Sequence, residues 1–386
     1  MSLLVLSAGD VQRVTSTFSP QYLQLLMADV FALVSTPKTG SSPLSYTPHR
    51  IAIPTERHKA LFMPARISAV GTTMKVVSAP TDASDTGGLP ASTIVLDKQS
   101  GAVKAIVNAR SLTALRNAAG SLLSTTLIGP VKPSHIVAFG AGQQILANLD
   151  LHLKAFSSIR TCTVVNRSLN SRVRDLVDKL KSSHPSVEIN TLSLRTGDDQ
   201  PSDGVKEALS TASIVITATP SSNPLFPSAW VPSGTHVILI GSYTKQMKEI
   251  DRDLVMRAVH SRETISKKPL PRLLVDSVEA CLQDAGELID AGLGKKQMSE
   301  IGVLVVAARA RNGHATPEEM RDILWSTTDL REGQGISFDG PITLFKSVGI
   351  GLQDVAVTIA VIEKAKEIQA EDGTGLGVLL NDYDTA

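Results

Sequence analysis

Residues 135–145 read HIVAFGAGQQI, a short apolar run followed by a glycine turn and the start of a helical pattern. In such a turn Gly140 permits the tight bend, and Gly142 lets a phosphate approach the backbone at the N-terminus of the helix. A third small residue usually follows three positions later, where this chain has Ile145. Taken alone, the turn is equally compatible with an ordinary connection between a strand and a helix.

The pattern around this turn predicts a parallel sheet. From residue 131 onward, apolar runs alternate mostly with helical stretches, of which Gln143–Phe156 and Ser168–Lys181 are the clearest. This alternation is typical of a parallel sheet with helices on both faces, and six strands match a doubly wound Rossmann domain. The strands are expected at His135–Phe139, Thr161–Asn166, Val187–Leu192, Ser213–Ala218, His236–Gly241 and Leu273–Asp276.

The two ends of the chain follow a different pattern. Residues 1–130 mix strand and helix signals, ending in a long apolar helix over Leu112–Leu127. After about residue 335 the alternation stops: Ile342–Phe345 is a short strand or the start of a helix, and Gly351–Ala370 is one long helix. This tail is too short to fold alone. We therefore expect residues 1–130 and 339–386 to form one discontinuous α+β domain, leaving residues 131–338 as the Rossmann domain.

Composition excludes several classes of function. The net charge of +1 gives no reason to expect nucleic acid or an anionic membrane as a partner, and no apolar run is long enough to span a membrane. The two cysteines, Cys162 and Cys281, lack the spacing of a disulfide framework or a metal site, and the eight histidines are scattered. We expect a cytoplasmic protein without a bound metal.

The end of the second Rossmann strand indicates which dinucleotide is bound. A carboxylate at this position accepts from the ribose 2′-hydroxyl of NAD, whereas a neutral residue with an arginine accommodates the 2′-phosphate of NADP. Here Asn166 is followed by Arg167, with Ser168 and Arg172 nearby. Because guanidinium binds phosphate bidentately, these residues favour NADP(H) over NAD(H). The alternative is that Arg167 is an ordinary solvated side chain.

Several segments, in order along residues 50–360, together resemble the ornithine cyclodeaminase/mu-crystallin family. They are Leu61–Ala65, Lys75–Ser78, Leu112–Ala119, Gly140–Gln144, Ala218–Pro220, Gly234–His236 with Gly241, Lys248–Asp251, Gly286–Glu287 and Thr343–Gly349. The resemblance implies a homodimer in which the discontinuous domain serves substrate binding and dimerisation. It also implies hydride transfer between a nicotinamide and the α-carbon of an amino or imino acid.

Three cations match the carboxylate clamp of this family, namely Arg50, Lys75 and Arg116. Such a clamp would hold a small carboxylate-bearing substrate in a fixed orientation. Lys75 lies in an apolar strand and Arg116 on an apolar helix, so a buried structural ion pair is the alternative for these two. Arg50 lies in a loop, where a solvated arginine is the alternative.

The same resemblance assigns further residues to the cofactor. It places Gln143 and Gln144 against the pyrophosphate, and Asn117 where the family usually has a threonine that contacts the cofactor. Val348 would lie near the nicotinamide or the substrate. The remaining residues expected near the cofactor are Thr219, Gly241 and Ser347.

One departure from the family pattern bears on the reaction. Ornithine cyclodeaminases carry a catalytic aspartate two residues beyond the glycine that matches Gly241, and here that position is Tyr243. Tyrosine is not a carboxylate base at neutral pH, so deamination of ornithine is disfavoured. Reduction of a preformed imine needs no strong base, because solvent can protonate the nitrogen. Tyr243 would contact that nitrogen, close the pocket, or serve only as a packing aromatic.

These features predict an NADPH-dependent reductase that converts a cyclic ketimine carboxylate to a proline- or pipecolate-like amino acid, with Lys75 and Tyr243 as candidate catalytic residues. Three alternatives remain: an amino acid dehydrogenase acting on an open-chain 2-oxo acid plus ammonia, an ornithine cyclodeaminase, and a non-catalytic crystallin-like protein that binds NADPH or a small ligand. Two polar stretches longer than the family pattern, Ser261–Arg272 and Trp325–Gly340, are either lids or extended loops.

Overall fold

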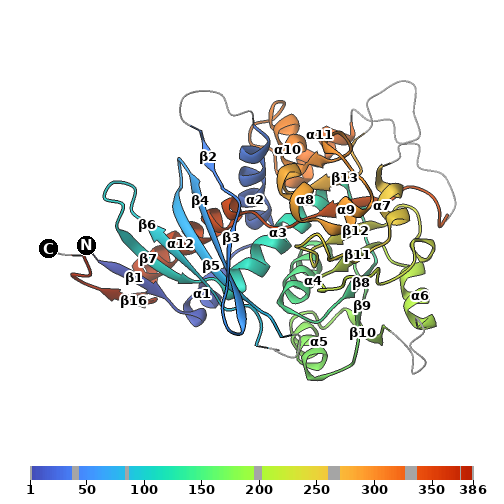
Figure 1. Ribbon diagram of the computed structural model, residues 1–386, viewed down its shortest axis with the longest axis horizontal. Coiled ribbons are helices and arrows are strands. Elements are labelled where there is room, and N and C mark those ends of the chain that lie inside the picture. The colour runs from blue at the N-terminus through green and yellow to red at the C-terminus, as the bar shows by residue number, and fades with distance from the viewer. Residues whose placement is uncertain are drawn as a thin grey trace. The chain divides into compact units, whose positions relative to one another are not determined.

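The computed structural model (Figure 1) describes residues 2–36, 43–82, 87–194, 202–259, 270–326, 337–373 and 375–384. The chain forms two compact units. Unit 1 comprises residues 1–116 and 349–386, and unit 2 comprises residues 117–348. Both Ser261–Arg272 and Trp325–Gly340 lie largely outside the described residues, so their expected role as lids or loops stays a prediction.

Unit 2 is built on an eight-stranded sheet in which every pair of neighbouring strands is parallel. The inner strands are almost continuously apolar and buried because helices cover both faces of such a sheet. The strand order is β10 (Glu188–Ser193), β9 (Thr161–Asn166), β8 (His135–Phe139), β11 (Ile214–Thr217), β12 (His236–Leu239), β15 (Thr343–Lys346), β13 (Leu273–Val275) and β14 (Ser299–Glu300). The expected Rossmann fold class is confirmed.

The helices of unit 2 follow these strands in the chain. They are the end of α3 (Arg110–Ile128), α4 (Gln143–Ala155), α5 (Ser171–Ser183), α6 (Asp203–Ser210), α7 (Arg252–Val259), α8 (Val278–Asp284), α9 (Gly286–Asp290), α10 (Ile301–Arg309) and α11 (Pro317–Trp325), with short 3-10 turns at Ser228–Trp230 and Lys295–Gln297. Helix α5 begins at Ser171, three residues later than expected. The reason is that Asn170 caps the helix, because its side-chain oxygen accepts a hydrogen bond from the backbone N–H of Val173.

Strand β15 shifts the boundary expected near residue 338. Residues 342–345 were assigned to the tail that joins the first domain, whereas β15 pairs with β12 and with β13 inside the Rossmann sheet. At the other boundary, helix α3 runs through residue 116, and its later part belongs to unit 2. Along the chain, the boundaries between the units fall at 116/117 and 348/349, whereas the sequence suggested 130/131 and 338/339.

Unit 1 combines a mostly antiparallel sheet with helices from both ends of the chain. The strand order is β16 (Val378–Leu380), β1 (Leu3–Leu6), β7 (Val103–Asn108), β6 (Ala91–Leu96), β5 (Gly71–Pro80), β4 (His58–Ile67) and β2 (Ser45–Tyr46), and β3 (Ile51–Pro54) also pairs with β4. Figure 1 shows β1 and β16 side by side near the two labelled termini, as their antiparallel pairing requires. Arg50 lies between β2 and β3, in a loop as the sequence predicts.

Helix α12 (Gly351–Asp372) forms the centre of the core of unit 1. Its buried residues Val357 and Val361 belong to one apolar cluster with Val95 of β6, Val107 of β7 and residues of α1 (Ala8–Thr15). Helix α2 (Pro20–Ser35) also packs against α12. Because α12 follows the last strand of the Rossmann sheet, the chain returns to unit 1 only after unit 2 is complete.

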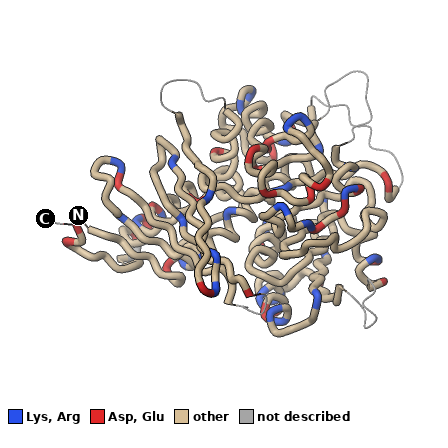
Figure 2. The backbone as a smooth tube through the Cα atoms, in the orientation of Figure 1, with Lys and Arg blue, Asp and Glu red and all other residues tan. Residues whose placement is uncertain are grey.

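Charge and hydropathy agree with this two-unit description. In Figure 2 the Lys and Arg residues and the Asp and Glu residues are interspersed along the tube, without a long run of one sign. No helix in the described ranges is both long and apolar enough to cross a membrane. Within those same ranges, no group of three or more His, Cys, Asp or Glu residues is arranged to hold a metal ion.

Candidate functional site

The glycine turn joins β8 to α4 as the sequence predicts. Gly140 has a φ of +111°, a conformation that favours glycine, and a Cβ there would lie 3.0 Å from the carbonyl oxygen of Ala218. Gly142 is the N-cap of α4, where no side chain caps the helix, and a Cβ on it would meet no atom within 4 Å. The N-terminal N–H groups of α4 and this open approach fit the pyrophosphate of a dinucleotide.

Ile145 explains how the turn tolerates its unusual third position. Its side chain is fully buried, and its Cγ1 would lie 3.5 Å from a Cβ on Gly140. The isoleucine therefore fills the space between helix and strand that a small residue usually leaves for close packing. In the same region Asn117 donates to Oε1 of Gln144 at 3.2 Å, whereas Gln143 is exposed. The structure thus brings two of the expected cofactor residues together.

The residues after β9 lie at the surface. The side-chain amide of Asn166 donates to the carbonyl of Ser168 at 2.8 Å, which shapes the turn. Arg167, Ser168 and Arg172 are all exposed. The geometry leaves the Arg167 guanidinium accessible to a phosphate, and it equally suits the solvated alternative.

A buried glutamate joins the loops that follow β11 and β12. Oε1 of Glu249 accepts from the N–H and the hydroxyl of Thr219 at 2.6 and 2.8 Å, and Oε2 accepts from the N–H of Gly241 at 2.7 Å. Burial raises the pKa of Glu249, while the charge of Lys346 and the hydrogen bond from the backbone of Thr219 oppose the rise. A Cβ on Gly241 would lie 2.1 Å from the carbonyl oxygen of Thr219, so only glycine fits there. Sequence reasoning missed Glu249, although it stands in one of the segments that resemble the family.

A second buried network lies at the ends of β12, β13 and β15. Nζ of Lys346 donates to the carbonyl and the hydroxyl of Ser242, both at 2.7 Å, and pairs with Glu287 at 2.9 Å. The Ser242 hydroxyl also donates to Glu287. Tyr243, which follows Ser242, is partly buried. The backbone that carries Tyr243 is therefore fixed on its N-terminal side by three fully buried side chains.

The neighbouring residues Ser347 and Val348 are also placed by buried groups. The hydroxyl of Ser347 donates to Oδ2 of Asp276 at 2.7 Å, so a cofactor that contacts Ser347 would use the lone pairs of this hydroxyl. Val348 is partly buried and packs against the apolar core of unit 2. Both residues belong to unit 2, whereas Arg50, Lys75 and Arg116 belong to unit 1.

Lys75 lies on the buried face of β5, and it is 1% exposed. The alternation of the strand places Lys75 on the same face as Thr73 and Val77, because successive side chains point to opposite sides. Its Nζ pairs with Oδ2 of Asp354 at 2.8 Å. Burial lowers the pKa of Lys75 to about 8, the carboxylate of Asp354 opposes this, and the nearby charges of Arg116 and Arg50 add to it.

Arg116 is held beside the same carboxylate. Its Nε lies 3.3 Å from Oδ1 of Asp354, and its Nη1 donates to Oε1 of Gln353 at 2.7 Å. Gly349, with a φ of +80°, lies against the guanidinium so closely that a Cβ would come within 2.6 Å of Nη1. The structure therefore brings Lys75 and Arg116 together through Asp354. Arg50, just before β3, is partly exposed and near enough to affect the charge of Lys75.

Two residues near Lys75 were not expected from the sequence. Asp354 is the anion that the buried ion-pair alternative required, and the helical pattern of α12 gave no sign that it faces Lys75. Thr93 of β6 stands opposite Lys75 in the register, is fully buried, and its hydroxyl has no hydrogen-bond partner within the described parts of the chain. Thr93 is identified as a neighbour of Lys75 by the residue-by-residue pairing of β5 with β6, and this pairing is known only from the structure.

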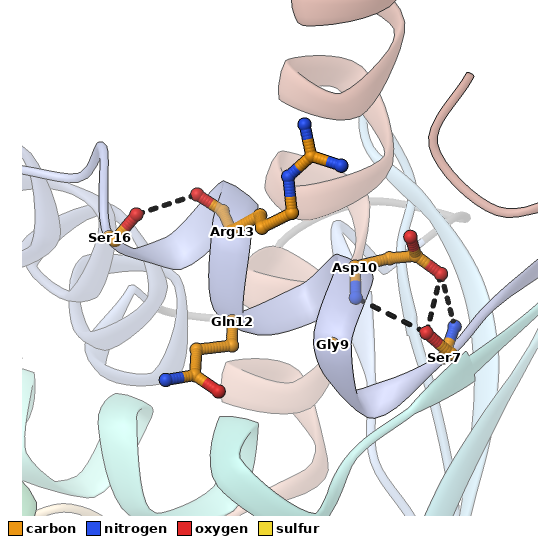
Figure 3. Close-up of a pocket in the computed structure, with 6 residues that line it drawn as sticks. All are labelled: Ser7, Gly9, Asp10, Gln12, Arg13 and Ser16. Carbon is orange, nitrogen blue, oxygen red and sulfur yellow. Dashed lines mark hydrogen bonds between the residues drawn. The ribbon is translucent and has the colours of Figure 1, made fainter. Parts of the chain in front are cut away.

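A surface pocket at the start of α1 lies away from these residues along the chain (Figure 3). It is lined by Ser7, Gly9, Asp10, Gln12, Arg13 and Ser16. In Figure 3 the Asp10 carboxylate bonds back to Ser7, which is the capping box of α1. Ser7 and Asp10 thus cap the N-terminus of α1, and none of the expected site residues lines the pocket.

The parallel sheet and the glycine turn between β8 and α4 define an α/β protein of the Rossmann class, with polar networks near the carboxyl ends of the parallel strands. The chain belongs to the ornithine cyclodeaminase/mu-crystallin family, whose sequence profile matches residues 10–269. The resemblance noted from the sequence is thereby confirmed.

Individual members of the family are similar along nearly the whole chain. The ketimine reductase mu-crystallin of Mus musculus is 25% identical over 355 residues, which cover 91% of this chain and 93% of that protein.

Two solved structures share the fold. The Δ1-pyrroline-2-carboxylate reductase of Thermococcus litoralis, in complex with NADH and L-proline, has a TM-score of 0.70 at 22% identity and covers 97% of this chain and 100% of its own. An archaeal alanine dehydrogenase dimer with bound NAD has a TM-score of 0.71 at 20% identity, covering 99% and 100%.

Proposed function

We propose that the protein is an NADPH-dependent reductase that converts a cyclic ketimine carboxylate to a proline- or pipecolate-like amino acid. Membership of its family, with a ketimine reductase among the relatives, supports an NAD(P)H-dependent oxidoreductase. The observation that carries the finer proposal is the buried cluster of Lys75 and Arg116 in unit 1. Buried cations are costly, and the residual positive charge of this cluster suits a substrate carboxylate.

The expected roles follow from the chemistry of each group. Arg116 and Arg50 would bind the substrate carboxylate through their guanidinium groups, and Lys75 through its ammonium group. Thr93 would add a hydroxyl beside Lys75. When bound, the reduced nicotinamide supplies a hydride. The α-carbon receives this hydride, and the nitrogen keeps the proton that it carries as an iminium ion.

Tyr243 supports reduction over deamination. A cyclodeaminase needs a base at this position, and a phenol hydroxyl serves instead as a hydrogen-bond donor or acceptor for the ring nitrogen. The buried contacts of Ser242 with Lys346 and Glu287 hold the tyrosine backbone in place. We therefore expect Tyr243→Phe to retain measurable turnover. If Tyr243 were an essential catalytic base, the same variant would have no measurable turnover.

Turnover assays separate this proposal from its alternatives. NADPH oxidation is measured with ketimine carboxylates of five- and six-membered rings, and separately with 2-oxo acids plus ammonia. The proposal requires the ketimines to be used with the higher kcat/KM. Faster turnover of 2-oxo acids plus ammonia would instead establish an amino acid dehydrogenase, an activity that a fold neighbour carries. Release of ammonia from ornithine would indicate a cyclodeaminase, and binding without any turnover would indicate a crystallin-like role.

The proposed preference for NADP(H) depends on Arg167. We expect Arg167→Ala to raise KM for NADPH about tenfold, equivalent to ~1.4 kcal/mol, because a charge-assisted contact to the 2′-phosphate is lost. KM for NADH should stay the same, since NADH has no such phosphate. Arg174→Ala, which removes an exposed arginine one turn into α5, is the matched control. An unchanged KM for NADPH in Arg167→Ala would refute the preference.

We also propose that the protein is a homodimer. Strand β3 exposes Ile51 and Ile53, which are 59% and 49% accessible, and β16 exposes three consecutive apolar residues, Val378–Leu380. Apolar strands exposed in this way are a liability unless a partner covers them. Light scattering should give about twice the mass of the chain, and a monomer at micromolar concentration would contradict the proposal.

We propose a cytoplasmic location because both cysteines are free thiols. Cys162 and Cys281 are both buried free thiols, and burial raises the pKa of each. Such cysteines are typical of proteins in a reducing compartment. Fractionation of cells that produce the protein would test this.

A further inference from the structure

One carboxylate, that of Asp354, lies between the two buried cations of unit 1. Its Oδ2 is 2.8 Å from Nζ of Lys75, and its Oδ1 is 3.3 Å from Nε of Arg116. The side chains of all three residues are at most 3% exposed. A substrate carboxylate that binds Lys75 and Arg116 would therefore approach two cations that are already paired with the carboxylate of Asp354.

The charges around Lys75 come from three elements. Arg116 on α3 and Arg50 before β3 both repel a proton on Lys75, whereas Asp354 on α12 attracts it. The strands on either side contribute no charge at this register, because β4 presents Met63 and β6 presents Thr93. Burial also opposes the charged form. Asp354 is therefore the only group among these that favours a protonated Lys75.

The position of Asp354 suits this task. It stands in the first turn of α12, where the helix dipole stabilises negative charge. The preceding residue, Gln353, accepts from Arg116 and also donates to the carbonyl of Arg116 at 3.4 Å. The first turn of α12 thus contacts both cations through two adjacent side chains.

We propose that Asp354 is a positioning residue, which keeps Lys75 charged and orients Lys75 and Arg116 for a substrate carboxylate. This inference rests on the proposed carboxylate clamp and adds a residue to it. Lys75, Arg116 and Asp354 together carry a net charge of +1, so the cluster retains attraction for an anion. An ion pair that served only to fill the core would need no residual charge.

The test uses the full-length protein saturated with NADPH. Its probes are pyrrole-2-carboxylate and picolinate, planar ring carboxylates that cannot be reduced by the enzyme. Calorimetry gives the affinity of each variant for the tighter-binding probe over a series of pH values. In the wild type, affinity should fall as pH rises through about 8, the pKa of Lys75. This readout depends on carboxylate binding and does not require turnover.

The central variant is Asp354→Asn, which keeps the shape of the side chain and removes its charge. We expect it to lower the affinity for the probe at least tenfold at pH 8 and to move the pH midpoint to a lower value, because Lys75 loses its proton more readily. Asp354→Glu should keep the wild-type midpoint. Glu367→Gln, an exposed change on the same helix, is the matched control and should change neither quantity.

A second design covers an unstable Asp354→Asn protein. Arginine stays charged without help from a carboxylate, so Lys75→Arg combined with Asp354→Asn should bind the probe without a midpoint near pH 8. The inference is overturned if a folded Asp354→Asn protein keeps both the wild-type affinity and the wild-type midpoint, or if the wild type binds neither probe. If the probe binds as expected while ketimines are not reduced, the proposed reaction fails and the inference on Asp354 stands.

Discussion

Gly349 shows how one backbone position constrains the side chain of Arg116, a residue of the proposed carboxylate clamp. It has a positive φ, and its hydrogen atom faces the guanidinium of Arg116 at a distance where no side chain fits. The same guanidinium also contacts the side chains of Gln353 and Asp354. Arg116 is therefore held by the first turn of α12 and by the glycine just before this helix.

We predict that Gly349→Ala weakens substrate binding more than it weakens the fold. A Cβ would displace the guanidinium, so KM for the carboxylate substrate should rise about tenfold or more, the equivalent of ~1.4 kcal/mol. Steady-state kinetics measure this effect.

Gly373→Ala provides the control for backbone strain. Gly373 also has a positive φ, at +64°, but a Cβ there would contact nothing within 4 Å. Both variants should lose about 1 kcal/mol of unfolding free energy from the strained backbone, and only Gly349→Ala should change KM. A parallel change in KM for both would show that Arg116 is not the cause.

At the scale of elements, β8 and α4 were the most predictable part of the chain. The strand His135–Phe139 has the bounds that the sequence predicts, and α4 ends one residue before the expected Phe156. The fold was predictable here because apolar runs and glycine turns are local signals. Contacts between distant elements were not: Asp354 meets Lys75 across 279 positions of the chain, and Glu249 joins two loops through hydrogen bonds that no pattern in the sequence encodes.

The place of β15 was missed for a similar reason. Its four residues are a short apolar run, and such a run does not tell which sheet it joins. Only pairing with β12 and β13 assigns it to unit 2. The three cations of the proposed clamp, by contrast, came from family resemblance, and the structure adds that Lys75 and Arg116 share the carboxylate of Asp354.

The N-terminus of α4 gives a prediction that separates folding from cofactor binding. Gly142 has an ordinary φ of −92°, and a Cβ on it would meet no atom, so Gly142→Val should change the unfolding free energy by less than about 1 kcal/mol. The isopropyl group would occupy the approach of the pyrophosphate, and NADPH affinity should fall at least tenfold. Fluorescence titration with NADPH measures the affinity.

Gly313→Val serves as its control, since Gly313 is also free of contacts for a Cβ. If Gly142→Val bound NADPH as tightly as the wild type, the turn would not be the phosphate site.

At the scale of the whole molecule, two neutral histidines are sealed inside unit 2. His152 accepts from or donates to Thr125 at 2.9 Å, and His236 lies between Ser124 and Thr343. Burial lowers the pKa of His152 to about 4 and that of His236 to about 3. In the unfolded chain both would titrate near 6.5.

We therefore predict acid sensitivity. Below pH 6.5 the unfolded chain binds protons that the folded chain excludes, so the unfolding free energy falls as pH drops from about 6.5 to about 4. Each histidine contributes up to roughly 3 kcal/mol to this loss. Urea denaturation at a series of pH values measures it.

His152→Gln removes one titrating group and should flatten the pH profile, whereas His314→Gln, at an exposed position, should leave it unchanged. An identical slope in wild type and His152→Gln would show that His152 does not remain neutral in the fold.

The insertion of β15 between β12 and β13 has a consequence for synthesis on the ribosome. The Rossmann sheet lacks an inner strand until residue 346 has emerged, and unit 1 lacks its central helix until residue 372 has emerged. A nascent chain of 340 residues has thus completed neither unit. Until β15 has been synthesised, the unpaired edges of β12 and β13 are expected to make stalled chains clients for chaperones.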